Sequence, residues 1–191
     1  MNEADFRVVA DFFNNQSVGA ALGAFAAFAL VVLTDWRRER RKLKTLRSEV
    51  EVNLEHAKAK LATARRMRAL LRERNETTPA PVLRFNTAFM RQLVGEVMHH
   101  LSGDQRRAIE GLCYTMEAID EIFSQSQTIA QQFTGPLGHA ERDSLSQNLH
   151  LNWSDTVTNL KRLIEMCEHY LAGRFSYLLN KQYDAKNYEE P

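Results

Sequence analysis

The side chains best suited to acid–base or metal chemistry in this 191-residue chain are its histidines and cysteines. They are His56, His99, His100, His139, His150, His169, Cys113 and Cys167. Zinc hydrolases place their ligands at a fixed helical spacing such as H-E-x-x-H, which the chain lacks. On an α-helix the side chains of His99 and His100 point about 100° apart, so only one of them serves a given site. We therefore expect no metal, no cofactor, and two cysteines that stay reduced in a core.

Other catalytic signatures are missing from the sequence. A phosphate-binding loop needs glycines in a pattern such as G-x-G-x-x-G or G-x-x-x-x-G-K-[ST], because backbone amides must approach the phosphate closely. Serine hydrolases of the α/β class carry G-x-S-x-G. None of these patterns occurs in the chain, and no dedicated small-molecule site is evident. We therefore predict that the protein is not an enzyme.

One pair of residues has a spacing that fits phosphodiester chemistry. Arg162 precedes His169 with six residues between them, which resembles the R-x4-6-H motif of the HEPN family of helical ribonucleases. In that family the two residues, paired across a dimer, act on the phosphate and the 2′-hydroxyl of RNA. A guanidinium binds phosphate and an imidazole transfers protons, so the residue types suit this chemistry. The resemblance implies a membrane-tethered ribonuclease as one alternative function; the other interpretation is an exposed arginine and a histidine on a helix surface.

An apolar run extends from Ser17 to Thr34 without a charged residue. Eighteen residues at about 1.5 Å each give a helix of roughly 27 Å, close to the thickness of the hydrocarbon core of a bilayer. The alternatives are a buried core helix and a cleaved signal peptide. A core helix seldom lacks polar residues on every side over this length, and a signal peptide begins with basic residues, whereas acids dominate before this run. We predict an uncleaved transmembrane helix over residues 17–36.

Seven basic residues follow the apolar run and form a membrane-proximal basic cluster. They are Arg37, Arg38, Arg40, Arg41, Lys42, Lys44 and Arg47. Lys and Arg stay on the cytoplasmic side of a bacterial inner membrane, so the N-terminus is expected outside and the remaining chain in the cytoplasm. The same charges suit anionic lipid, which makes membrane lipid an expected partner. Residues 1–16 are expected to form a short extracytoplasmic or interfacial segment, with a disordered tail as the alternative.

Small side chains mark one face of the predicted span. Gly19, Gly23 and Ala27 are each four residues apart, so they stack along one side of a helix. In lipid, helices associate mainly by close van der Waals packing at such positions. We predict an oligomer interface in the membrane at these residues, and therefore a homo-oligomer. The alternative is that small residues are simply common in spans.

A long amphipathic helix is predicted over residues 37–74. Its apolar residues recur at steps of three and four: Leu43, Leu46, Val50, Leu54, Ala57, Leu61, Ala64, Met67 and Leu71. The prolines of segment 75–81 end it.

The remaining helices of the expected bundle lie within 84–183. The first is predicted from about Asn86 to His100, with Asn86 or Thr87 as its cap. The second begins with a capping box at Ser102 and Gln105 and runs to Phe133. The third runs from Asp143 or Ser144 to about Gln182. The apolar stripe of the last two includes Ile109, Leu112, Cys113, Met116, Ile119, Phe123, Ile129, Phe133, Leu149, Trp153, Val157, Leu160, Ile164, Cys167 and Leu171. Residues 184–191 are expected to be a flexible tail. We predict an all-α fold, with an N-terminal transmembrane helix continuous with a cytoplasmic antiparallel helical bundle.

Composition and layout together narrow the function. A net charge of +1 and a pI of about 7.8 argue against a general nucleic-acid-binding protein. The order of elements resembles the small single-pass membrane-anchored helical effectors of bacterial anti-phage systems, including the pore-forming accessory protein of some RNA-targeting CRISPR systems. The resemblance implies an oligomer whose cytoplasmic domain receives a protein or nucleic-acid signal and whose spans then depolarise the inner membrane. The alternative is a passive scaffold or adaptor that recruits a cytoplasmic partner.

Overall fold

The protein is mostly helical in the part of the chain that its computed structural model describes, which is residues 16–74, 77, 83–133 and 138–176. The elements are α2 (Gln16–Arg74), α3 (Thr87–Val97), the 3-10 turn η1 (Met98–His100), α4 (Gly103–Phe133) and α5 (His139–Leu171). No strand occurs in these ranges, so the predicted all-α class is confirmed. The expectations for residues 1–15 and for the tail 184–191 fall outside the described residues.

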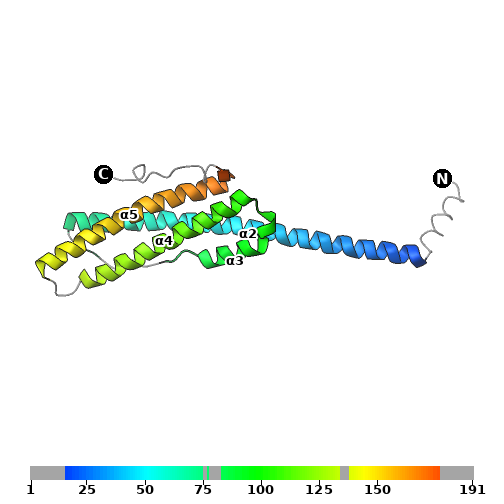
Figure 1. Cartoon of the computed structure of the whole chain (residues 1–191), viewed down its shortest axis with the longest axis horizontal. Helices are drawn as coiled ribbons and strands as arrows, with labels where there is room; N and C mark the ends of the chain where they lie inside the picture. The colour runs from blue at the N-terminus through cyan, green and yellow to red at the C-terminus, as the bar shows by residue number, and fades with distance from the viewer. Residues whose placement is uncertain (1–15, 75–76, 78–82, 134–137, 177–191) are drawn as a thin grey trace. The chain divides into compact units, whose positions relative to one another are not determined.

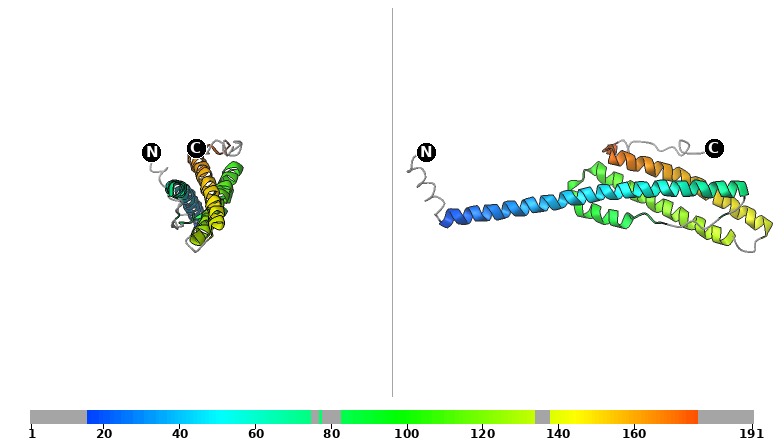
Figure 2. Two further views of the ribbon diagram at one scale, coloured as in Figure 1. Left: turned by 90° about the vertical axis from the view of Figure 1, so that its left-hand side faces the viewer. Right: turned by 180° about the vertical axis from the view of Figure 1, so that it is seen from behind.

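The chain divides into two compact units, Met1–Lys44 and Thr45–Pro191. α2 supplies the described helix of the first unit, and its portion from Thr45 onward belongs to the second. The second unit also contains α3, α4 and α5. In this unit the later portion of α2, α4 and α5 lie side by side, as Figures 1 and 2 both show.

The second unit has a core built on the stripe predicted for α2. Eight of its residues are buried: Leu46, Val50, Leu54, Ala57, Leu61, Ala64, Met67 and Leu71. Their spacing of three and four residues keeps them on one face of a helix with 3.6 residues per turn, and burial of that face stabilises the unit by removing apolar surface from water. The predicted stripe over this portion of α2 is confirmed.

α4 and α5 pack against each other in opposite directions. Gly111 and Thr115, early in α4, lie next to Met166, late in α5. The Met166 Cε is 3.7 Å from the position that a Cβ on Gly111 would take, and the Met166 sulfur is 3.9 Å from the Thr115 hydroxyl oxygen. Further along α4, the ring of Phe123 meets that of Trp153 edge to face, with centroids 5.3 Å apart. Because contacts move forward on one helix as they move backward on the other, the pair is antiparallel.

The predicted capping box at the start of α4 is confirmed. The backbone N–H of Ser102 donates to the side-chain oxygen of Gln105 at 2.8 Å, and the N–H of Gln105 donates to the Ser102 hydroxyl at 3.2 Å. These bonds satisfy two amides that a helix start otherwise leaves unpaired. At the start of α3 the expectation fails in part, since Asn86 is the cap residue but makes no side-chain capping hydrogen bond.

The predicted stripe of α4 is wrong in its last turns. Ile129 is only half-buried, whereas Ser126 and Ala130 are buried. From Phe123 the core face continues through 126, 130 and 133, which keeps the helical period. Ser126 tolerates burial because its hydroxyl donates to the carbonyl oxygen of Ile122 at 2.8 Å.

Both predicted ends of α5 are wrong. The helix begins at His139, ahead of the predicted Asp143 or Ser144, and its first residues are exposed, so no apolar pattern marked them. It ends at Leu171 and not near Gln182, because Gly173 has a φ of +73°, which favours glycine. The N–H groups of Gly173 and Arg174 donate to the carbonyl oxygens of Tyr170 and His169, the two bonds of a Schellman motif.

Candidate functional site

The first unit exposes a long apolar helical surface. Within α2 the candidate span contains an 18-residue apolar window of which no residue is buried. Its large side chains are well exposed, with Phe25 at 71 % and Phe28 at 68 %. The hydroxyl of Thr34 donates to the carbonyl oxygen of Leu30 at 2.6 Å, so this polar group is satisfied within the helix. A helix of this length and composition is compatible with crossing a bilayer.

The small residues predicted as an oligomer interface lie on this exposed surface. Gly19, Gly23 and Ala27 are all exposed. A Cβ atom added at Gly19 or Gly23 would have no heavy atom within 4 Å, apart from the neighbouring helix backbone. Successive members are about 6 Å apart along the axis, since four residues rise 1.5 Å each. The geometry leaves room for the backbone of another helix to approach closely.

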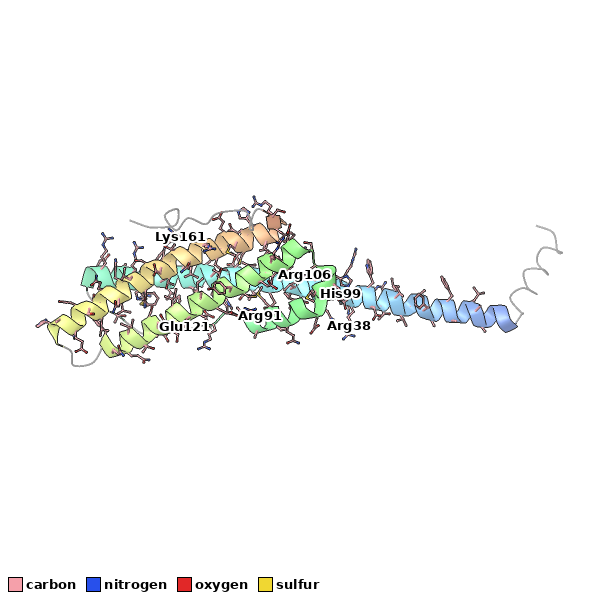
Figure 3. All side chains as sticks on the ribbon, in the orientation of Figure 1. Arg38, Arg91, His99, Arg106, Glu121 and Lys161 are labelled. Carbon is pink, nitrogen blue, oxygen red and sulfur yellow. The ribbon has the colours of Figure 1, made fainter. Side chains whose placement is uncertain are left out.

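At the end of the apolar surface, an aromatic ring and a guanidinium are stacked. Trp36 is 49 % exposed, and the Arg40 guanidinium carbon lies 4.0 Å from the centroid of its ring. Arg37, Arg38 and Lys44 are exposed, and Figure 3 shows Arg38 projecting from α2. Aromatic residues followed by arginines are typical of the boundary between hydrocarbon and headgroups.

Arg47 has a different role from the other members of the predicted basic cluster. It lies in the second unit, where its Nη2 donates to the main-chain carbonyl oxygen of Leu171 at 2.9 Å. It also lies 3.6 Å from the carboxylate of Glu51. Leu171 is the last residue of α5, so a cation at this carbonyl offsets the negative end of the helix dipole. Arg47 therefore serves the packing of the bundle.

The core of the second unit contains a buried ion pair that the sequence analysis missed. Lys60 of α2 and Asp120 of α4 form a salt bridge, with side chains only 8 % and 14 % exposed. The Lys60 ammonium also lies 4.4 Å from the ring centroid of Phe85 and 4.9 Å from that of Phe123. Burial lowers the pKa of Lys60, while the hydrogen bond that Lys60 donates to the Asp120 carboxylate opposes this shift. Asp120 also accepts a hydrogen bond from the Phe85 backbone N–H at 2.8 Å, so one carboxylate joins α2, α4 and the segment before α3.

The candidate catalytic pair is placed on α5 with one member buried. His169 is 8 % exposed, and its Nε2 lies 3.4 Å from the Glu165 carboxylate. The expectation of a histidine on a helix surface is therefore wrong for this residue. Arg162 is half-buried, and because the two residues are seven positions apart on the helix, they lie about 10 Å apart along its axis. An imidazole this enclosed does not offer a surface to RNA, so the geometry gives the ribonuclease hypothesis no support.

His99 and His100 lie closer together than expected. They are in η1, the 3-10 turn that follows α3, and their ring centroids are 4.1 Å apart. Neighbouring residues of a 3-10 turn point about 120° apart, so the change of helix type does not account for the short distance between the rings. The spacing of Glu96 and His99 also matches the E-x-x-H pattern of metal-binding bundles, which the sequence analysis overlooked. Because α3 ends at Val97, His99 is not on the same regular α-helix as Glu96.

The remaining histidines and the cysteines show no shared site. His139 and His150 are exposed and His56 is half-buried. Both cysteines are in the core, as predicted, at 1 % exposure for Cys113 and 0 % for Cys167. Burial raises the pKa of the Cys113 thiol to about 11 and that of Cys167 to about 12. Thiols in this state are poor nucleophiles.

A small pocket of about 200 Å³ lies between α3 and α4. It is lined by Arg91, Val94, Gly95, Ile109, Glu110 and Cys113. Ligand sites for small molecules usually occupy roughly 300–1,000 Å³, so this volume suits a single side chain better than a metabolite. Beside the pocket, Arg91 donates two hydrogen bonds to Glu117, at 3.1 and 2.9 Å.

No protein-family model, curated protein or solved structure matches the chain. The features of the chain that bear on its function are the exposed apolar helix, the basic residues that follow it and the packing of the second unit.

Proposed function

We propose that the protein is a self-associating, single-pass inner-membrane protein whose cytoplasmic helical unit docks a partner. In this proposal the N-terminus faces out, α2 crosses the membrane, and the second unit lies in the cytoplasm. Docking of a protein or nucleic-acid signal then changes the assembly of the spans, which perturbs or depolarises the membrane as in the anti-phage effectors that the layout resembles.

The complete exposure of the apolar window in α2 carries the proposal. A core helix of a soluble protein meets the same criteria of length and composition, but it buries most of its apolar surface, whereas this window buries none. Exposed side chains such as Phe25 and Phe28 would favour aggregation in water, and lipid removes them from water without a protein partner. Sodium carbonate extraction of membranes that contain the full chain tests this step. Recovery in the soluble fraction would contradict it.

The orientation is supported by the position of the basic residues. Arg37 and Arg38 lie directly after the apolar window and Lys44 follows further along α2. An excess of such residues marks the cytoplasmic end of a span. Protease added outside intact spheroplasts should therefore leave the second unit uncut. Digestion of that unit from outside would reverse the proposed topology.

Self-association is proposed through Gly19, Gly23 and Ala27. Gly23→Leu adds a bulky side chain to the face where another helix is expected, so it should weaken oligomers trapped by crosslinking in membranes. Ala21→Leu is the matched control because residue 21 lies roughly opposite on the helix. An unchanged crosslinking ladder for Gly23→Leu, or equal losses for both variants, would remove this interface from the proposal.

The passive adaptor is the second candidate, and one observation favours it. From Val18 to Leu33 the helix has no polar side chain, and Thr34 bonds to its own backbone, so a ring of these helices would offer ions no polar lining. Membrane potential after controlled expression distinguishes the candidates. Depolarisation that Gly23→Leu prevents supports the effector, whereas normal polarisation with retained assembly supports the adaptor.

A further inference from the structure

Positive charge is concentrated in one short part of α2. We define the basic collar as Arg37, Arg38, Arg40, Arg41, Lys42 and Lys44, all within the first unit. Against these six, residues 35–44 contain two acids, Asp35 and Glu39, so the segment carries a net charge of +4. The whole chain carries +1, which leaves −3 for the remaining residues. The collar is therefore a local feature, and a general affinity of the chain for polyanions does not explain it.

The collar surrounds much of the helix. At about 100° per residue, its six side chains are distributed over an arc of about 200°, and Glu39 and Leu43 occupy the remaining face. A site for one flat partner would need the charges on a narrower face. An arc this wide suits several small anionic groups arranged around a helix.

The collar begins at the depth where headgroups are expected. Arg37 is four residues and about 6 Å along the axis from Leu33, the last aliphatic residue of the apolar window, and Lys44 is about 16 Å from it. Trp36 lies between Leu33 and Arg37, where an aromatic residue is typical of the membrane interface. The Arg40 guanidinium carbon lies 4.0 Å from the centroid of the Trp36 ring. Most collar residues thus lie within the headgroup layer or within a Debye length of it.

The residue types favour phosphate. Four of the six members are arginines, whose planar guanidinium forms paired hydrogen bonds with phosphate oxygens, whereas lysine acts as a point charge. Arg47 is excluded from the collar because it lies in the second unit and donates to the carbonyl oxygen of Leu171. Lys42 is kept although it donates to the Glu39 carboxylate at 3.4 Å, because that pair lies within the collar segment.

From the charge, the arc, the depth and the residue types together, we infer that the basic collar binds the phosphate groups of anionic phospholipids and so selects the lipids around the span. This inference depends on the proposed membrane span and adds a lipid class as a specific partner. Lipid binding is a different role from setting the orientation of the span. Basic residues that only set the orientation act during insertion and need no lipid preference afterwards.

The test uses the full chain reconstituted in vesicles, with brominated lipids as quenchers of tryptophan fluorescence. Trp36 lies beside the collar, whereas Trp153 is 1 % exposed in the core of the second unit and contributes a constant background. Quenching by dibromo-phosphatidylglycerol is compared with quenching by dibromo-phosphatidylcholine at equal mole fractions. The ratio gives the relative affinity of the lipid shell for the anionic headgroup.

The wild-type protein should prefer phosphatidylglycerol by about fivefold or more in low salt, and 0.5 M NaCl should reduce the preference. The triple variant R37Q/R38Q/R41Q should bring the ratio to within about twofold of one. Arg40 is kept because it contacts the reporter ring. The matched control R66Q/R72Q/R174Q removes three exposed arginines from the second unit and should keep the wild-type ratio.

Five other outcomes would contradict the lipid site or the span on which it depends. Equal quenching of the wild type by both lipids, or an unchanged ratio in the collar variant, overturns the lipid site while the span remains valid. A loss of preference in the control variant overturns a site specific to the collar. Absence of quenching by either lipid contradicts the span itself. Loss of the preference when equimolar single-stranded RNA is added would assign the collar to nucleic acid and overturn the inference.

Discussion

The guanidinium of Arg47 donates a 2.9 Å hydrogen bond to the carbonyl oxygen of Leu171, 124 residues further along the chain. The bond joins α2 to the last residue of α5 within the second unit. It places a cation at the negative end of α5, where the last four backbone carbonyls have no i+4 partner within the α-helix. One residue of a basic run is thus part of the fold, while its neighbours lie in the first unit.

Replacement of Arg47 should destabilise the second unit. Arg47→Ala removes a charged hydrogen bond at an exposed position, so we expect a loss of about 1 kcal/mol in the free energy of unfolding. Chemical denaturation in detergent, followed by the fluorescence of Trp153, measures this loss. Arg66→Ala, an exposed arginine on the same helix, is the control. Equal stability of Arg47→Ala and Arg66→Ala would show that the bond contributes nothing measurable.

Removal of Lys60 alone should be more damaging than removal of the pair. Lys60→Met leaves the Asp120 carboxylate buried without its cation, which costs about 3 kcal/mol in typical cases. The double variant K60M/D120N removes both charges and keeps an oxygen for the Phe85 N–H, so it should lose less than Lys60→Met. A double-mutant cycle of unfolding free energies measures the coupling. If the loss for K60M/D120N equals the sum of the losses for Lys60→Met and Asp120→Asn, the two residues are not coupled and the prediction is wrong.

Cys113 and Cys167 should resist alkylation in the folded protein. With a thiol pKa near 11 or 12 and almost no exposure, the thiolate fraction at pH 8 is very small. Iodoacetamide should react at least about 100-fold more slowly than in urea, where an ordinary cysteine pKa applies. Mass spectrometry of the alkylated protein gives both rates. Rapid labelling of either cysteine without denaturant would contradict the described packing.

The Arg91–Glu117 pair should make a small, pH-dependent contribution to stability. The hydrogen bonds from Arg91 lower the pKa of the Glu117 carboxyl in the folded protein. The unfolded chain therefore binds more protons in acid, so the contribution is present above about pH 4.3 and is lost as the pH falls through the folded pKa. Both side chains are about half exposed, so we expect less than about 1 kcal/mol.

The Glu117→Gln variant tests this contribution. Its deficit in unfolding free energy relative to the wild type should be measurable at pH 7 and smaller at pH 3. Glu73→Gln, which changes an exposed glutamate on α2, should show no deficit at either pH. A deficit for Glu117→Gln that is the same at both pH values would assign it to packing and not to charge.

The helical class and much of the core were predictable because burial follows the apolar period. The stripe from Leu46 to Leu71 is regular, and the capping box of Ser102 and Gln105 is a local pattern in which both partners lie within one turn. Features of this kind need no knowledge of the rest of the fold. The early start of α5 was missed because its first turn is exposed and therefore has no apolar signal. Gly173 was the available signal for its end.

The polar interactions between distant segments were not predictable from periodicity. Lys60 lies next to the apolar position Leu61, and only the packing of α2 on α4 pairs it with Asp120. His169 was expected at the surface because histidine is often exposed, yet the packing of α5 buries it. The long apolar helix, its small-residue face and the basic collar were recognisable from the order and spacing of residues, and membrane insertion, self-association and lipid binding stay predictions until the experiments above are made.

Non-covalent contacts join the later portion of α2 to the elements that follow the connection between Arg74 and Leu83. The Asn53 amide lies 3.0 Å from the Met90 sulfur, Lys60 pairs with Asp120, and Arg47 reaches Leu171. None of these contacts requires an intact peptide chain between the two sides. A protein nicked between residues 74 and 83 should therefore remain a stable two-fragment complex, and its halves made as separate polypeptides should reassemble.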